Sequence, residues 1–175
     1  MSSALTFYFK EIFPKEDDFI TYLIEYDIVD VSGSENLIFA KYIYKVLFRQ
    51  YCNSNIQYDT PDEFKCDLAN ILEDSFDEWK KQLDVAKKTQ ELTDDELLEV
   101  TTAISNSANN PNTKLPNPKD LIEYVGAQVS SFSSNGKLVG YVTALSMIPT
   151  HMIGKILKDC GRLFKTIIPN QIFIY

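Results

Sequence analysis

The stretch from Thr60 to Lys88 limits the possible folds more than any other part of the chain, because its pattern is that of one long helix. Thr60, Pro61 and Glu63 predict a capping box, with proline at the first helical position, where its missing N–H is not needed. At about 1.5 Å per residue, 29 residues make a rod of roughly 43 Å, which needs partner helices along its apolar side. Apolar residues recur along that side at steps of about three and four residues, which is the period of one helix face. They are Phe64, Leu68, Ile71, Leu72, Phe76, Trp79, Leu83 and Ala86.

Other segments carry helical signals too, so we predict a mainly α fold of five to seven helices in a single domain over residues 1–175. Thr93 and Glu96 make a second capping box, which starts a helix over 93–108. We expect this helix and the one at 60–88 to form an antiparallel hairpin around which the bundle is built. Further helices are predicted at 15–26, 34–52 and 121–129.

Loop signals separate these segments, and one region is ambiguous. Residues 53–59 are interpreted as a loop, and the Asn- and Pro-rich residues 105–118 as a long exposed loop. Within residues 128–143, Asn135-Gly136 is typical of a hairpin turn, whereas the apolar spacing that follows is helical. We favour a helix over 137–148 and keep the hairpin as the alternative. A last helix is expected to restart at Pro149 and to end at Pro169.

Both ends of the chain are apolar. Residues 5–13 and 171–175 alternate aromatic and β-branched side chains, a pattern that makes a strand edge and an aggregation hazard if left bare. Each end either folds back onto its own core or adds a strand to a neighbouring subunit, and we favour exchange with a neighbour. The termini 1–13 and 170–175 are therefore predicted docking arms. Their candidate interaction residues are Phe7, Phe9, Phe13, Ile172, Phe173, Ile174 and Tyr175.

Charge is distributed unevenly along the chain. The net charge is −8, and residues 1–104 hold 22 acids and 10 bases, whereas the rest of the chain is mildly basic. An acidic body argues against general nucleic-acid binding and leaves room for end-to-end charge complementarity between copies or partners. The solvent-exposed face of the expected last helix could bind phosphates or an acidic protein. Its bases are Lys155, Lys158, Arg162 and Lys165.

No motif of phosphate-binding loops, dinucleotide-binding folds or zinc proteases occurs in the chain. The one histidine, His151, is interpreted as a capping or surface residue at a helix start. The three cysteines, Cys52, Cys66 and Cys160, form no C-x-x-C pair and are interpreted as small apolar residues in or near the core. We therefore expect no catalytic residues, no metal and no cofactor.

Carboxylates on the long helix are the best alternative to that expectation. Glu73 with Asp77, and Asp74 with Glu78, are pairs four residues apart whose oxygens could hold Mg²⁺ or Ca²⁺. The Glu-x-x-His ligands that complete di-metal bundles do not occur, so a solvated face is favoured. An enzyme that uses these carboxylates is our third hypothesis for the function.

The chain contains no run of about 18 apolar residues, which a membrane span needs, and its first residues lack the features of a signal peptide. We therefore expect a cytosolic origin and no membrane contact. Acid-dense residues 59–99 could also compete for a basic groove on another protein. This makes a small acidic cytosolic protein that binds and regulates a host protein our second hypothesis.

The leading hypothesis comes from a resemblance that covers most of the chain. The segments FYFKEIFP, AKYIYKVLFRQYCNSNIQYDTPDEF, NNPNTKLPNP, NGKLVGYVTALSMIP and GRLFKTIIP are similar in character to virion proteins of tailed bacteriophages, above all the helical head–tail adaptor or connector proteins. The resemblance implies a non-enzymatic homo-oligomer that forms a ring below the portal, in contact with portal and tail proteins. It also implies DNA passage without sequence-specific binding, and a place in the virion after assembly in the host cytoplasm.

Overall fold

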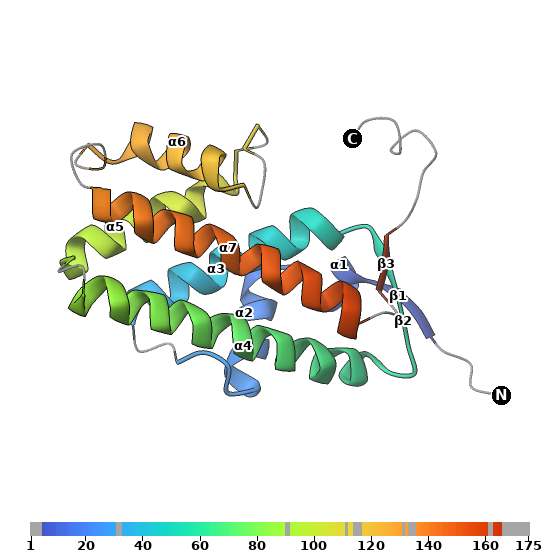
Figure 1. The fold of residues 1–175 in the computed structure, drawn as a ribbon. Coiled ribbons are helices and arrows are strands. Elements are labelled where there is room, and N and C mark those ends of the chain that lie inside the picture. Colours follow the sequence, from blue (N-terminus) through green and yellow to red (C-terminus); the bar gives the residue numbers. More distant parts are fainter. Residues whose placement is uncertain are drawn as a thin grey trace.

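Seven helices and three strands make up the part of the chain that the computed structural model describes, which is residues 5–30, 33–89, 92–110, 112–113, 117–130, 132, 136–160 and 163–165. The helices form a bundle, and the strands form a small sheet at one end of it (Figure 1). The predicted mainly α fold is therefore confirmed. In chain order the elements are β1 (Leu5–Tyr8), α1 (Phe9–Ile12), α2 (Glu16–Glu25), α3 (Ser34–Tyr51), β2 (Ser54–Tyr58), α4 (Pro61–Lys88), α5 (Asp94–Ser107), α6 (Pro118–Gln128), α7 (Gly136–Asp159) and β3 (Leu163–Lys165).

The long helix α4 starts where its sequence predicts and buries the predicted apolar side. The Thr60 hydroxyl accepts a hydrogen bond from the Glu63 N–H at 3.2 Å, and Pro61 opens the first turn. The buried side of the helix includes Trp79, whose ring stacks on Phe39 of α3 with a centroid distance of 4.7 Å and an interplanar angle of 7°. This contact fixes α4 against the interior of the bundle.

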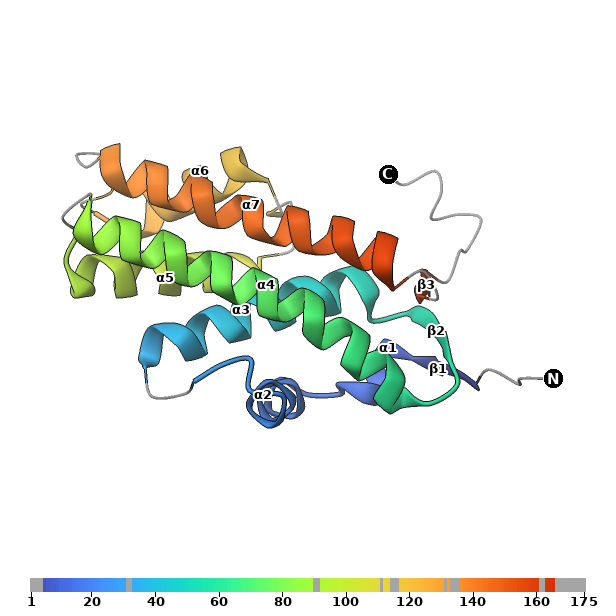
Figure 2. The ribbon, with the colours of Figure 1, turned by 60° about the horizontal axis from the view of Figure 1, so that its bottom comes forward.

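The most extensive contact of α4 is with α7. Helix α4 packs most extensively against α7, and α3 packs against α5, while α6 covers α5 and α7. Figures 1 and 2 both show α7 running alongside α4. The short connection from Lys88 to Asp94 joins α4 to α5 as the expected hairpin, but the long apolar side of α4 is covered mainly by α7. A short connection brings only helix ends together, whereas apolar side chains along the helices decide which faces pack.

Helix α7 also departs from prediction. The hairpin alternative is excluded, because residues 136–159 are helical, but the helix continues through Pro149 instead of restarting there. Leu145, Met152 and Ile156 are buried on both sides of the proline, so packing continues in phase past the missing backbone donor. The helix ends at Asp159 and the chain enters β3, so the expected helix up to Pro169 is also wrong.

The sheet joins segments far apart in sequence, with β2 at its centre and β1 and β3 as its edges, both antiparallel to β2. Residues 54–58, which we interpreted as loop, thus form the central strand. Ser54, Ile56 and Tyr58 are buried in alternation, which is the strand period. The register pairs Leu5 with Tyr58, Tyr8 with Asn55, Ser54 with Lys165 and Ile56 with Leu163.

Residues 5–13 pack into the core of their own chain, which corrects their prediction as a docking arm. Phe7, Phe9 and Phe13 are 9%, 1% and 0% exposed. The Phe13 ring meets Phe19 edge-on at 5.4 Å, and the Tyr44 hydroxyl donates to the Phe13 carbonyl at 2.8 Å. The predicted arm 170–175 lies outside the described residues, as do Ile172, Phe173, Ile174 and Tyr175.

The predicted loop 105–118 is shorter and better anchored than expected. Residues 105–107 belong to α5, because the helix runs to Ser107, and residue 118 already opens α6. Arg49 of α3 donates to the carbonyls of Asn110 and Thr113 at 2.6 and 2.7 Å. These charge-assisted hydrogen bonds hold the described part of the loop against α3.

Candidate functional site

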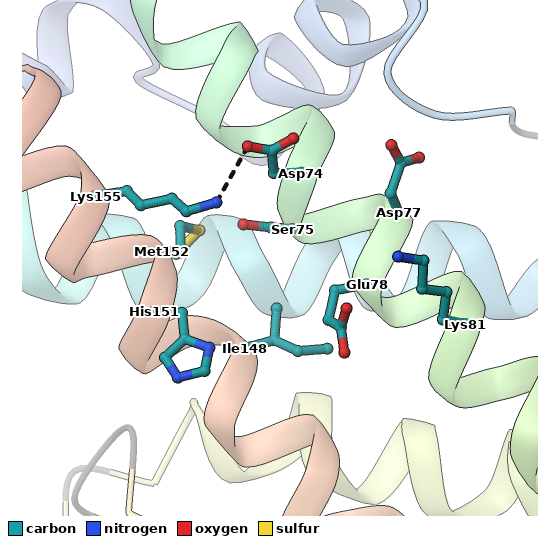
Figure 3. Close-up of a pocket in the computed structure, with 9 residues that line it drawn as sticks. All are labelled: Asp74, Ser75, Asp77, Glu78, Lys81, Ile148, His151, Met152 and Lys155. Carbon is teal, nitrogen blue, oxygen red and sulfur yellow. Dashed lines mark hydrogen bonds and ion pairs between the residues drawn. The ribbon is translucent and has the colours of Figure 1, made fainter.

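A groove between α4 and α7 gathers polar groups from both helices (Figure 3). Its volume is about 570 Å³. Residues three or four positions apart share one face of a helix, so each helix contributes several side chains to one wall of the groove. The lining residues are Asp74, Ser75, Asp77, Glu78 and Lys81 of α4, and Ile148, His151, Met152 and Lys155 of α7.

The groove has an apolar floor and a charged rim. Ile148, Met152 and Ser75 are buried, while Asp77, Lys81 and His151 are exposed. A buried floor beneath exposed charges suits a bound segment that has an apolar ridge and polar flanks.

One ion pair crosses the groove. The Lys155 ammonium lies 3.1 Å from a carboxylate oxygen of Asp74, as the dashed line in Figure 3 shows. Their side chains are 47% and 63% exposed, so solvent screens this pair and it adds at most about 1 kcal/mol to stability. Glu78 accepts a hydrogen bond from Gln82 on its own helix at 3.1 Å.

Groups for nucleophilic catalysis do not converge in the groove. The Ser75 hydroxyl donates to the Ile71 carbonyl at 3.1 Å, so it is engaged with its own helix. His151 lies inside α7 and not at a helix start, which corrects our expectation, and it is exposed as predicted. Within the described residues His151 forms no ion pair with a carboxylate, so no nucleophile, base and orienting acid are aligned there.

The carboxylates of α4 do not assemble a metal site in the described part of the chain. Asp74, Asp77 and Glu78 line the groove, whereas Glu73 is exposed outside it. No group of three or more His, Cys, Asp or Glu side chains among the described residues could hold a metal ion.

The predicted basic face is divided between two elements. Lys155 and Lys158 are exposed on α7. Lys165 belongs to β3, and Arg162 lies outside the described residues. Because α7 ends at Asp159, Lys165 does not share a helical face with Lys155 and Lys158 as we had expected.

The cysteines differ in their surroundings. Cys160 is buried, and its burial raises the pKa of its thiol to about 11. Cys52 is half-buried. Cys66 is exposed, contrary to our expectation of a core residue, and its sulfur lies 3.9 Å from the Tyr26 hydroxyl. Only Cys160 is fully enclosed.

A second surface, which we call the β1 edge, is the side of Leu5–Tyr8 that faces away from β2. Two side chains of this strand, Leu5 and Tyr8, are 53% and 38% exposed. The apolar pattern of the terminal segment does not identify which side of the strand stays open, because the pairing of β1 with β2 joins residues about fifty positions apart. The alternating pattern of residues 5–8 was the available signal.

Comparisons with known proteins found no relative of this chain. No protein-family model, no characterised protein and no solved structure matches the chain. No helix in the described part of the chain has the length and apolar character to cross a membrane.

Proposed function

We propose that this chain is a non-enzymatic structural subunit of a phage particle, which forms a homo-oligomeric ring that joins head to tail below the portal. The observation that carries the proposal is the sheet at one end of the bundle, where β1 and β3 are both edge strands. Edge strands offer unpaired backbone groups to another chain, which is a common way for subunits to join. The resemblance of the sequence to connector proteins supports the same role.

A role in binding rather than catalysis fits the groove between α4 and α7. Its polar groups are engaged with their own helices or exposed on the rim, as Ser75, Glu78 and His151 illustrate. A groove of this kind can hold a segment of the portal or a tail protein between two rigid helices. Partner recognition needs only such shape and charge complementarity.

The charge of the chain fits passage of DNA without binding it. The body is acidic, with a net charge of −8 for the whole chain, so its surface repels phosphates on average. A channel lined by such a surface would let DNA slide, since counterion release, the main source of non-specific affinity, needs clusters of bases.

Mass spectrometry of purified phage particles tests the proposal. We expect the chain in complete particles, and we expect particles made without it to separate into heads and tails. Absence of the chain from complete particles would overturn the assignment.

A second candidate, a protein that binds and regulates a host protein, is favoured by one observation. Asp77 stands exposed on the rim of the groove and forms no ion pair within the described residues. A basic segment of a host protein could pair with it. Recovery of a host protein by pull-down with the wild type, and its loss with Asp77→Asn, would support this role, whereas recovery of virion components alone would exclude it.

A further inference from the structure

We propose that the β1 edge receives residues 171–175 of a second copy of this chain as an added antiparallel strand. The inference deepens the proposed function by naming the contact between subunits, and it rests on that function only for its biological setting. Self-association of the purified chain tests it directly.

Among the described residues, no strand pairs with the outer side of β1. Strand β1 pairs with β2 on one side only, because the strand order is β1-β2-β3. Within the described chain, residues 5–7 take part in no backbone hydrogen bond outside that ladder. Successive residues of a strand turn their N–H and C=O groups to alternate sides, so about half of these groups face outward.

The edge also lacks the usual protection against pairing. Residues 5–8 contain no charge, no proline and no bulge, and two of their side chains, Leu5 and Tyr8, are exposed. The Lys10 ammonium lies over the Tyr8 ring, 5.6 Å from its centre. Such an edge is a template for another strand.

The position of β3 indicates where an added strand would come from. Both β1 and β3 are antiparallel to β2, so they run parallel to each other, and Lys165 lies opposite Ser54 at the end of the sheet where β1 finishes. Residues 171–175, QIFIY, follow after only five intervening residues and combine strong strand propensity with no charge. Within each copy the chain therefore leaves β3 toward the donor segment at the end of the sheet where β1 finishes.

A donor from the same chain would meet an obstacle. To reach the outer side of β1, the chain would have to cross three strand spacings, about 14 Å. The six steps from residue 165 to residue 171 span at most about 20 Å when fully extended, so length alone allows this crossing. The obstacle is helix α1, which begins directly after Tyr8, at the end of the sheet where the crossing would run, and contacts both β1 and β2. A second copy supplies the same segment without this detour, and repeated head-to-tail contacts close into a ring.

Size-exclusion chromatography with light scattering, alongside circular dichroism, tests the proposal on the full chain and on a chain that ends at Asn170. We expect the full chain to associate beyond one copy and the shortened chain to stay single with its helical signal intact. A full chain that stays single at all concentrations, or a shortened chain that associates equally well, would overturn the proposal.

Two substitutions test the same contact in the full chain, so their result does not depend on whether the shortened chain folds. Leu5→Thr should weaken association, because Thr keeps strand propensity but removes exposed apolar surface at the edge. Val85→Thr is the matched control, since Val85 is 42% exposed and lies about 36 Å along α4 from the end next to β2. Equal effects of the two substitutions would count against the β1 edge.

A synthetic peptide of residues 166–175 tests the backbone pairing itself. We expect it to dissociate the full-length assembly, and we expect the same peptide with alternate N-methylated amides to be about tenfold weaker or worse, since two or more hydrogen bonds are lost. Equal potency of both peptides would exclude strand addition. Tail-dependent association of a chain that is absent from particles would leave this inference standing while the proposed function fails.

Discussion

A single ring pair shows how one residue positions a helix. Trp79 is the one tryptophan of the chain and is 0% exposed, and its stacked partner Phe39 also meets Phe76 edge-on at 5.4 Å. Phe39 therefore joins α3 to two turns of α4. Aromatic pairs in such arrangements contribute beyond their burial alone.

Phe39→Ala should lower the free energy of unfolding by about 3–5 kcal/mol, because it leaves a cavity against Trp79. Urea unfolding followed by tryptophan fluorescence measures this loss, and the native emission should shift to the red as water reaches the indole ring. Val85→Ala, an exposed control, should change stability by no more than about 0.5 kcal/mol. Equal losses for both variants would contradict the role of the stack.

Buried proton donors make the fold sensitive to alkaline pH. Burial raises the pKa of Cys160 to about 11 and the pKa of Tyr51 to about 12, above their ordinary values of 9.0 and 10.0. Because the folded state holds these protons more tightly, stability is full below pH 9 and falls as pH rises toward 11 and 12. The urea midpoint should decrease over this range, and less steeply for Cys160→Ala between pH 9 and 11. A midpoint that is constant up to pH 11 would refute this.

At the scale of elements, the sequence predicts features that nearby residues determine, but not features that depend on residues far apart in the chain. The caps at Thr60 and Thr93 are complete within four residues of sequence, and both helices start where those residues indicate. Ile56 gave no such signal, because its strand is defined by partners at Phe7 and Leu163. For the same reason, sequence marked the carboxylates of α4 but could not place α7 across from them to form the groove.

Leu157 shows a second limit of periodicity. Leu157 is four residues from Ile153 and next to Ile156, a spacing that indicates the apolar face of the helix, yet it is 62% exposed. A helical period gives the direction of an apolar arc, but the position of neighbouring helices sets how much of that arc is covered. At the end of α7 the covered part reaches Ile156 and Cys160.

Pro149→Ala should stabilise the protein. Inside a helix, proline costs roughly 3 kcal/mol relative to alanine, and alanine would restore a donor for the Leu145 carbonyl. Loss of the buried ring offsets part of this, so we expect a net gain of about 1–2 kcal/mol in urea unfolding. Ile148→Ala, at the neighbouring buried position, should instead cost about 2–5 kcal/mol. A similar loss for both would show that the proline ring is needed for packing.

At the scale of the whole molecule, one continuous hydrophobic core joins residues from β1 through α7. We therefore expect a single cooperative unfolding transition. Tryptophan fluorescence, which reports on the α3–α4 contact, and far-ultraviolet circular dichroism, which reports on all helices, should give the same urea midpoint. Two separated midpoints would indicate that the bundle contains independently stable parts.

The sheet also determines the order in which the molecule can form. Ile56 and its partner Leu163 are separated by roughly a hundred residues of chain, whereas most helical contacts are local. Closing so long a loop before the helices have docked carries a large entropic cost, so β3 should reach β2 only after α7 has settled on α4. The three-stranded sheet is then completed late in folding, when little other apolar surface remains exposed. This order of events favours association of folded copies over aggregation of partly folded chains.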